Sequence, residues 1–361
     1  MVFRKSLLVK YRNIFRNKKI LVTGHTGFKG AWLSLWLTLL GAKVIGYSLK
    51  PINKKCDYIK LNLKNRIYKN YIGDLKDYNK ILNICNEHKP EIIFHLAAQA
   101  IVSEGIKNPY YNFSNNIQST LNLLEIFRKK NYFKIGIFIT SDKVYKNISD
   151  KKKYYSEEDI IYGEDPYSSS KAITEMLINS YLENYIANIK GKILCSARAG
   201  NVLGGGDYSI NRIFPDIIKS INNNRIINIR NPNHIRPWQY VLECLDGYLT
   251  LGYYALQNKK KVNGAWNFGP SNRNIHDVKK LVKETLKYFK YSKIKLRKSY
   301  LKEKKFLSLD TSKAKKNLRW VPKLNFKETI RLSVDDYKAE KLSGKEAFDF
   351  RCNRIKEYMK I

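Results

Sequence analysis

Three glycines spaced three residues apart, Gly24, Gly27 and Gly30, constrain this chain more than any other feature of its sequence. They stand between a β-branched run at 19–23 and a long apolar segment, which is the arrangement of a strand, a tight turn and a helix. Without side chains at the first two positions, the backbone can approach a pyrophosphate, which the helix amides and the helix dipole can bind. A second strand candidate follows at 43–47, so the sequence predicts a dinucleotide-binding unit near the start of the chain.

The same alternation of short apolar runs and helix-length segments continues to about residue 200, and it is typical of a parallel sheet with crossover helices. We therefore predict an α/β fold with a Rossmann-type, doubly wound parallel sheet. The strand candidates are Lys19–Thr23, Lys43–Tyr47, Glu91–His95, Lys134–Thr140 and Lys192–Ala197, with helices near 29–40, 77–88, 109–130 and 168–188.

Beyond residue 200 this rhythm loosens around three segments that we interpret as rich in loops. They are "GGGD" at 204–207, "NPNHIRPWQYV" at 231–241 and "GAWNFGP" at 264–270. The charged stretch 338–361 is typical of a surface helix. We predict a basic N-terminal segment (1–18), a dinucleotide-binding domain (19–200) and a smaller C-terminal substrate-binding lobe (201–361), partly interleaved with that domain.

The net charge of +37 comes from lysines that are spread along the whole chain. Such a charge favours anionic ligands in general, but proteins that bind specific nucleic acids more often gather their basic residues on one recognisable module. A solvated, lysine-rich surface is the simpler interpretation. We expect no specific nucleic-acid partner.

The cysteines and histidines carry no metal-binding pattern. The five cysteines form no CxxC pair and the five histidines have no ligand spacing, so we expect unpaired thiols, a reducing compartment and no metal site. No apolar run approaches the roughly 18 to 20 residues of a transmembrane helix. We expect a cytoplasmic protein without membrane insertion, whose basic start packs on the domain or frays, with binding to an anionic membrane surface as the alternative.

Tyr167 and Lys171, in "YSSSK", lie four residues apart and therefore on one face of a helix. A tyrosine with an ordinary pKa of about 10 is a poor base, but a neighbouring ammonium and a positive nicotinamide ring lower that pKa. The pair can then accept a proton from a sugar hydroxyl while a hydride leaves for the dinucleotide. A packed tyrosine beside a solvent lysine is the alternative, but the upstream Ser141 at a strand tip favours catalysis.

The GxxGxxG spacing resembles the short-chain dehydrogenase/reductase superfamily, and its extended branch in particular. The resemblance implies NAD as the cofactor, a lining for it in "HLAAQA" (95–100), and an adenine contact at Asp74, which could also cap a helix starting at 76. Ser48 and Lys50 stand where an acid would hold the adenosine ribose, so residue chemistry alone leaves NAD and NADP open. The implied cofactor-binding residues are Gly24, Thr26, Gly27, Phe28, Gly30, Asp74, Leu96, Ala97, Ala98, Tyr167 and Lys171.

The strand-tip segment "TSDKVY" (140–145) sets Asp142 and Lys143 directly after Ser141. Epimerases of the extended branch have ordinary residues at these two positions, whereas nucleotide-sugar 4,6-dehydratases have an acidic pair that serves dehydration. The Asp-Lys pair resembles the CDP-glucose 4,6-dehydratases, and Val144 and the lysine-rich stretch 146–163 depart from their pattern. The likeness extends through "LVTGHTGFKGAWLSLWL" (21–37), "LAAQAIV" (96–102), "DPYSSSK" (165–171), "ARAGNVLGGGD" (197–207) and "RPWQYVLECLDGYL" (236–249).

This resemblance implies that CDP-glucose is converted to a 4-keto-6-deoxy sugar with loss of water. Lys143 is the expected base for the C5 proton, or stabilises the enolate, and Asp142 is the expected acid for the departing 6-hydroxyl. Exchanged roles, or a mutual ion pair at the strand end, are the alternatives. The implied catalytic residues are Ser141, Asp142, Lys143, Tyr167 and Lys171, and the implied substrate-binding residues are Gln99, Asn201, Arg212 and Arg236.

Other functions stay open at this point. The main alternative is a 4-epimerase, or a dehydratase acting on another nucleotide sugar, because no residue identifies the cytosine base from first principles. A non-catalytic protein that binds a dinucleotide or a polyanion is a more distant alternative. The resemblance also implies a homodimer formed through a helix bundle built partly from 109–130 and 168–188.

Overall fold

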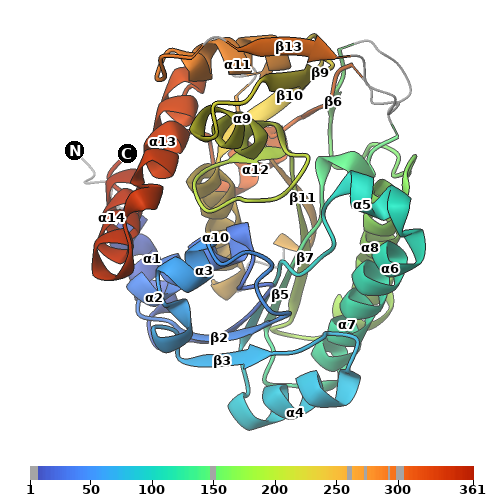
Figure 1. The fold of residues 1–361 in the computed structure, drawn as a ribbon. Coiled ribbons are helices and arrows are strands. Elements are labelled where there is room, and N and C mark those ends of the chain that lie inside the picture. The colour runs from blue at the N-terminus through green and yellow to red at the C-terminus, as the bar shows by residue number, and fades with distance from the viewer. Residues whose placement is uncertain (1–6, 147–151, 258–261, 272–274, 292, 298–304) are drawn as a thin grey trace, which may run out of the picture.

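The centre of the molecule is a parallel sheet of seven strands in the order β11-β7-β5-β4-β1-β2-β3 (Figure 1). The computed structural model describes residues 7–146, 152–257, 262–271, 275–291, 293–297 and 305–361. The sheet confirms the predicted Rossmann-type fold, and chain order reverses between β1 and β4, where doubly wound sheets bind ligands. The strands are β1 (Lys19–Thr23), β2 (Lys43–Ser48), β3 (Lys69–Ile72), β4 (Ile92–His95), β5 (Ile135–Ile139), β7 (Ile193–Ala199) and β11 (Gly264–Phe268).

The interpretation of "GAWNFGP" and "NPNHIRPWQYV" as loops is wrong. The first contains β11, which pairs in parallel with β7 and buries Trp266 and Phe268 completely. The second contains β10 (Ile235–Tyr240), which lies between β8 (Asn201–Leu203) and β12 (Ile275–Asp277) in a three-stranded sheet. Both strands carry residues with weak strand preference, such as glycine, asparagine and proline, so their pairing partners rather than their own sequences make them strands.

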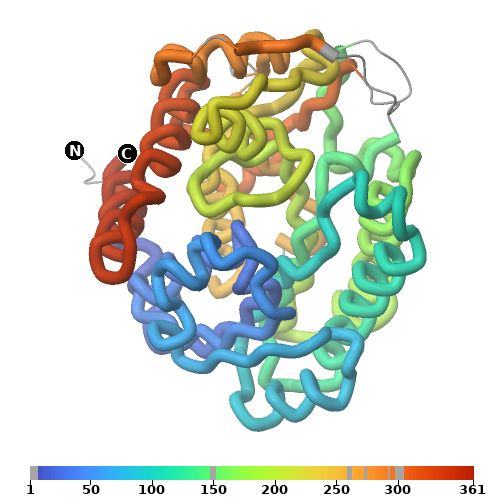
Figure 2. The backbone as a smooth tube through the Cα atoms, viewed as in Figure 1, coloured from blue at the N-terminus to red at the C-terminus, as the bar shows by residue number. Residues whose placement is uncertain are grey.

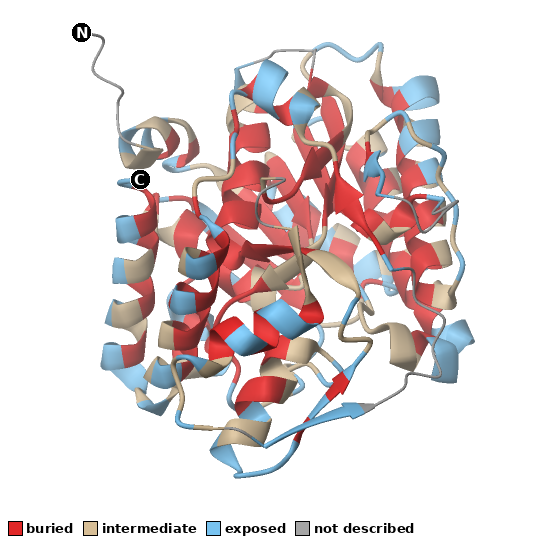
Figure 3. Ribbon diagram, turned by 90° about the horizontal axis from the view of Figure 1, so that it is seen from above, coloured by how far each residue is buried: buried red, intermediate tan, exposed pale blue. Residues whose placement is uncertain are grey.

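Helices cover both faces of the sheet, and alternate residues of each strand point to opposite faces. Ile20 and Val22 pack in one apolar cluster and Leu21 in the other. Figure 3 shows the buried residues concentrated between these layers. The first face carries α1 (Leu7–Phe15), α2 (Phe28–Leu39), α10 (Val241–Leu256), α12 (Ser312–Leu318) and α14 (Gly344–Tyr358), and the second carries α4 (Tyr78–His88), α7 (Ser119–Lys129) and α8 (Pro166–Tyr181).

Both ends of the described chain pack on the first face. Tyr11 and Phe15 of α1 are fully buried, and the Tyr11 hydroxyl lies 2.6 Å from Asp246 Oδ1 and 2.6 Å from Thr250 Oγ1 in α10. The described part of the basic N-terminal segment therefore packs on the domain. The helix predicted within 338–361 is confirmed as α14, which buries one side through residues such as Ile355.

A third apolar cluster forms the core of a smaller lobe. The green-yellow to orange segments of this lobe lie above the blue segments of the sheet in Figure 2. Because β7 leads almost directly into β8, the lobe lies next to the carboxyl ends of the central strands. Its elements are α9 (Ile213–Asn222), β9 (Ile227–Arg230), β10, α11 (Val278–Leu286), β13 (Ile294–Arg297) and α13 (Phe326–Lys338).

Short elements complete the described chain. They are α3 (Asp57–Lys60), α5 (Val102–Lys107), α6 (Pro109–Phe113), β6 (Tyr154–Tyr155), β14 (Ser308–Leu309), the π-helical turns Ser114–Gln118 and Leu182–Ile186, and the 3₁₀ turns Leu63–Asn65, Asp142–Val144 and Ala339–Lys341. All five cysteines are buried and unpaired. Within the described ranges, no helix is long and apolar enough to cross a bilayer, and no cluster of three or more metal-ligating side chains occurs.

Candidate active site

The glycine turn between β1 and α2 is a tight backbone cradle. Gly24 has a φ of +73°, and a Cβ at this position would lie 2.7 Å from the Ala97 nitrogen at the end of β4. A Cβ on Gly30 would lie 2.0 Å from the Gly24 carbonyl oxygen. The first turn of α2 can therefore lie this close to the loop only because residue 30 is a glycine. The helix N-cap is Gly27, which offers no side-chain acceptor to the helix amides. This cradle fits a dinucleotide pyrophosphate, which those amides can bind.

The structure places Asp74 at the carboxyl edge of the sheet, and the alternative role as a helix cap is wrong. Helix α4 begins at Tyr78, and its N-cap is Asp77, which accepts a hydrogen bond from the Lys80 amide at 3.0 Å. Asp74 instead accepts from the Lys76 amide at 2.9 Å, and its carbonyl accepts from the Tyr47 hydroxyl at 2.9 Å. The Asp74 side chain is therefore held in a local turn beside the end of β2.

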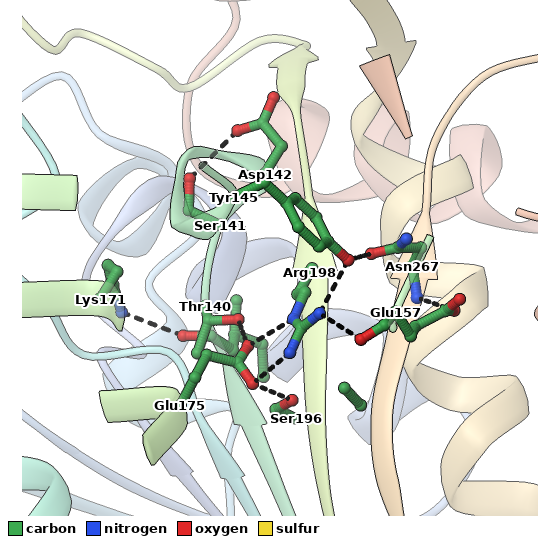
Figure 4. A network of polar contacts seen from close by, with 12 residues as sticks. Thr140, Ser141, Asp142, Tyr145, Glu157, Lys171, Glu175, Ser196, Arg198 and Asn267 are labelled. Atoms are coloured by element: carbon green, nitrogen blue, oxygen red, sulfur yellow. Dashed lines mark hydrogen bonds and ion pairs between the residues drawn. The ribbon is translucent and has the colours of Figure 1, made fainter. Parts of the chain in front are cut away.

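Helix α8 begins where its sequence provides a complete cap. Asp165 accepts hydrogen bonds from the amides of Tyr167 at 2.9 Å and Ser168 at 3.1 Å, and the Ser168 hydroxyl accepts from the Asp165 amide. This start places Tyr167 in the first turn and Lys171 one turn later, both buried. The Lys171 ammonium donates to the Ile139 carbonyl at the end of β5 at 3.0 Å, as Figure 4 shows. The predicted pair is thus fixed against the central sheet.

The Ser141–Val144 turn, which directly follows Thr140 beyond the end of β5, carries the predicted acid. The Ser141 hydroxyl donates to Asp142 Oδ1 at 3.1 Å and accepts from the Lys143 amide at 3.2 Å. Asp142 is buried, and its Oδ2 has no hydrogen-bond partner among the described residues. A Cβ on Gly200 would lie 2.9 Å from that oxygen, so the carboxyl group points at the junction of β7 and β8, next to Asn201.

Burial dominates the electrostatics of these groups. It raises the pKa of Asp142, against the lowering effects of Lys143, Ser141 and Arg236. It lowers the pKa of Lys171 to about 7, with a further contribution from Lys29. A buried carboxyl group with a raised pKa can stay protonated and act as an acid.

The pKa of Tyr167 differs from the expectation. In the protein it is raised rather than lowered, because removing the phenolate from water outweighs the lowering effects of the Ser141 hydroxyl and of the positive charge of Arg212. Ser141 and Arg212 are the groups with the largest opposing effects on this pKa. The tyrosine therefore needs a further positive charge next to it before it becomes an effective base.

The predicted substrate-binding arginines lie beside the catalytic groups. Arg236 acts electrostatically on Asp142, and its Nη1 donates to the Ile235 carbonyl at 2.9 Å. Arg212 acts on Tyr167, and its Nη2 donates to the Ala100 carbonyl at 3.2 Å. The structure thus brings both cations to the carboxyl edge of the sheet. Whether they bind substrate stays a prediction.

Sequence reasoning missed Asn116, which joins Gln99 to the catalytic helix. Asn116 lies in the π-helical turn Ser114–Gln118, a feature frequent at functional sites. Its side chain accepts from the Gln99 amide at 2.8 Å and donates to the Gln99 carbonyl at 3.1 Å and to Ser170 Oγ at 2.8 Å. Two adjacent asparagines, Asn115 and Asn116, in an otherwise amphipathic segment were the available signal.

Comparison with protein families assigns the chain to a known family. The family model described as GDP-mannose 4,6 dehydratase matches residues 21–333. The chain belongs to this family. A relative described as CDP-glucose 4,6-dehydratase, from Salmonella typhimurium, is 38% identical over 96% of this chain and 98% of its own length.

Solved structures with the same fold include members of several related activities. A UDP-glucose 4-epimerase from Thermotoga maritima superposes with a TM-score of 0.74 at 26% identity, covering 89% of this chain and 98% of its own. A dTDP-glucose 4,6-dehydratase from Bacillus anthracis, solved with NAD, gives a TM-score of 0.75 at 19% identity, covering 90% and 97%. Fold alone therefore does not separate dehydratase from epimerase, and the site residues must.

Proposed function

We propose that this chain is an NAD-dependent CDP-glucose 4,6-dehydratase, a hydro-lyase that converts CDP-glucose to CDP-4-dehydro-6-deoxy-glucose and water. The observation that carries this proposal is the buried Asp142, with Lys143 beside it, adjacent to Ser141 and across from Tyr167. An epimerase has no use for an elimination acid at this place. The 38% identity to the Salmonella relative over nearly its full length supports the same activity.

The residues present fit NAD. Its pyrophosphate would lie against Gly24, Gly27 and Gly30 at the start of α2, where a larger residue at Gly24 or Gly30 would clash with backbone. Thr26 and Phe28 in the same turn, the segment Leu96–Ala98 at the end of β4, and Asp74 beyond β3 would line the rest. When bound there, NAD would supply the hydride acceptor for oxidation at C4 and the hydride donor for reduction at C6.

Tyr167 and its neighbours carry out the first proton transfer, from the 4-hydroxyl of the hexose. Tyr167 accepts the proton of the 4-hydroxyl, and Ser141 holds the same oxygen by a hydrogen bond. Lys171 lies one turn away, fixed by the Ile139 carbonyl, and it stabilises the phenolate. The positive charge of an oxidised nicotinamide would add to this stabilisation.

Asp142 and Lys143 carry the elimination. The raised pKa of Asp142 favours the protonated acid, which can donate to the departing 6-hydroxyl. Lys143 follows Asp142 on the same turn, and it removes the C5 proton that the neighbouring ketone has made acidic. The pKa direction of Asp142 supports this assignment over the exchanged one.

Four residues would hold the nucleotide sugar. Arg236 and Arg212 provide cations for the diphosphate beside Asp142 and Tyr167. Asn201 at the start of β8 and Gln99 beyond β4 would contact the sugar and its phosphates. Their positions at the carboxyl edge of the strands agree with the usual place of ligands in such sheets.

Mass spectrometry of the purified protein tests this proposal. We expect bound NAD, and with CDP-glucose a product lighter by one water, formed faster than from dTDP- or GDP-glucose. A product of unchanged mass with inverted C4 would establish a 4-epimerase instead. Absence of turnover with every nucleotide hexose would contradict both activities.

We also propose a homodimer that forms through the surface of α6 and α8. The supporting observation is a group of exposed apolar side chains on these helices, with Tyr110 83% and Met176 56% exposed. Light scattering after gel filtration should give twice the chain mass, and Met176→Glu should shift the population toward monomer. A monomeric wild-type protein at micromolar concentration would contradict the dimer.

A further inference from the structure

A buried ion pair lies beneath the Ser141–Val144 turn, and the proposed chemistry does not use it. Glu175 on α8 and Arg198 on β7 have side chains that are each 3% exposed. Arg198 donates from Nε to Glu175 Oε1 and from Nη2 to Oε2, both at 2.9 Å, so the contact is bidentate. Burial raises the pKa of Glu175, but the charge and hydrogen bonds of Arg198 outweigh burial, and the net pKa is lowered. The pair is therefore ionised and fixed.

Hydrogen bonds tie both ends of the Ser141–Val144 turn to this ion pair (Figure 4). Thr140, directly before the turn, donates its hydroxyl proton to Glu175 Oε1. Tyr145, directly after the turn, accepts from Arg198 Nη1 at 2.7 Å and donates to Asn267 Oδ1 at 2.7 Å. The four residues between these two anchors include both members of the predicted elimination pair.

Glu175, the acidic member of the ion pair, lies on α8, the helix that also carries Tyr167 and Lys171. Glu175 follows Lys171 by four residues and Tyr167 by eight, so all three lie on one face of α8. A displacement of Glu175 relative to Arg198 would therefore shift Tyr167 relative to the turn. The pair joins the two halves of the active site, one that accepts the first proton and one that expels water.

We propose that the Glu175–Arg198 pair is a positioning device that holds the turn carrying Asp142 and Lys143 in register with Tyr167. Through Thr140 and Tyr145 it sets the rate of elimination relative to the rate of oxidation at C4. This inference rests on the proposed dehydratase function. Glu175 and Arg198 act through other residues and do not themselves touch substrate.

The variant Tyr145→Phe tests one anchor with little change in packing. The Tyr145 ring stacks on Tyr155 with centroids 5.3 Å apart, and phenylalanine retains that contact. We expect elimination to slow about tenfold while oxidation changes little, because small misplacements of catalytic groups cost at least this much. The 4-keto hexose that still carries its 6-hydroxyl then accumulates, and mass spectrometry detects it as a species two hydrogens lighter than the substrate and one oxygen heavier than the product.

A second readout needs no turnover. In the protein without substrate, the backbone amides of 141–145 should exchange with deuterated solvent faster in Tyr145→Phe than in wild type. Thr140→Val removes the anchor at the opposite end of the turn, and it should change the product ratio and the exchange in the same direction.

Tyr11→Phe is the matched control. It also removes a hydroxyl that is fully buried and hydrogen-bonded, but between α1 and α10, to Asp246 and Thr250. It should lower stability and leave the ratio of keto hexose to 6-deoxy product unchanged. Equal slowing of both steps in Tyr145→Phe and Thr140→Val, or unchanged exchange at 141–145, would overturn the proposal. Failure of the proposed function looks different, because wild-type protein would then form no 6-deoxy product from CDP-glucose.

Discussion

Two buried carboxyl groups, Asp142 within the Ser141–Val144 turn and Glu175 on α8, have opposite environments. Glu175 is 3% exposed and Asp142 is 4% exposed, and burial raises the pKa of both. The Glu175 oxygens accept hydrogen bonds from Thr140, Ser196 and both forks of Arg198, and these partners turn its net pKa downward. Asp142 accepts one side-chain hydrogen bond, from Ser141, and its pKa stays raised. A buried carboxylate whose two oxygens both accept hydrogen bonds, such as Glu175, stabilises the structure. A buried carboxyl group such as Asp142, whose Oδ2 has no hydrogen-bond partner among the described residues, is suited to donate a proton.

Asp142→Asn gives the largest expected effect. Turnover of CDP-glucose should fall by about 10² to 10⁴, the usual contribution of a general acid. The free energy of unfolding should stay unchanged or rise, because a neutral amide replaces a carboxyl group that is costly to ionise in the interior. Rates from product formation and urea denaturation of the same preparation measure both quantities. A marked loss of stability with little loss of rate would reverse the roles assigned to Asp142 and Glu175.

Arg198→Met should affect stability in the opposite way. It leaves Glu175 buried without its counter-charge, so the free energy of unfolding should fall by about 3 to 5 kcal/mol, measured by urea denaturation.

The double variant Glu175→Gln with Arg198→Met is the control for this stability change. It removes both charges, so it should recover a large part of the loss, since no uncompensated ion remains. A double variant as unstable as the sum of its two single variants would mean that the ion pair does not act as a unit.

The pH dependence of stability is the smallest effect, and it distinguishes the two acids by sign. The folded pKa of Glu175 is lowered from an ordinary value of 4.5, so its ionisation stabilises the fold above that pH and the contribution is lost as the pH falls through the lowered value. The folded pKa of Asp142 is raised from 3.8, so stability is lost as the pH rises from that value through the raised one.

Denaturation of wild type, Glu175→Gln and Asp142→Asn between about pH 2 and pH 8 measures this difference. The deficit of Glu175→Gln should shrink toward low pH, and any advantage of Asp142→Asn should grow toward high pH. If the free energy of unfolding of both variants follows pH in parallel with wild type, the proposed electrostatic difference between the two residues is wrong.

Local spacing predicted the glycine turn and the catalytic helix well. Gly24 and Gly30 are fixed by backbone contacts within one strand-turn-helix unit, and Tyr167 and Lys171 share a face because a helix repeats every 3.6 residues. The same approach failed at β11 and β10, which contain glycine, asparagine or proline and pair with β7 and β8. The alternative role of Asp74, as the cap of a helix starting at 76, is also wrong, because Asp77 caps α4.

The sequence by itself determined the parallel sheet, the glycine cradle and the order of the proposed catalytic residues, because these follow from patterns within about thirty residues of chain. Only the tertiary structure decided the ion pair, the anchoring of Tyr145 and the Asp142 oxygen that has no hydrogen-bond partner in the described part of the chain. Tyr145 lies 53 residues from Arg198 and 122 from Asn267, and contacts over such separations leave no periodic signal. Hydrogen bonding and burial set which acid is satisfied, and they exist only after the strands have brought those residues together.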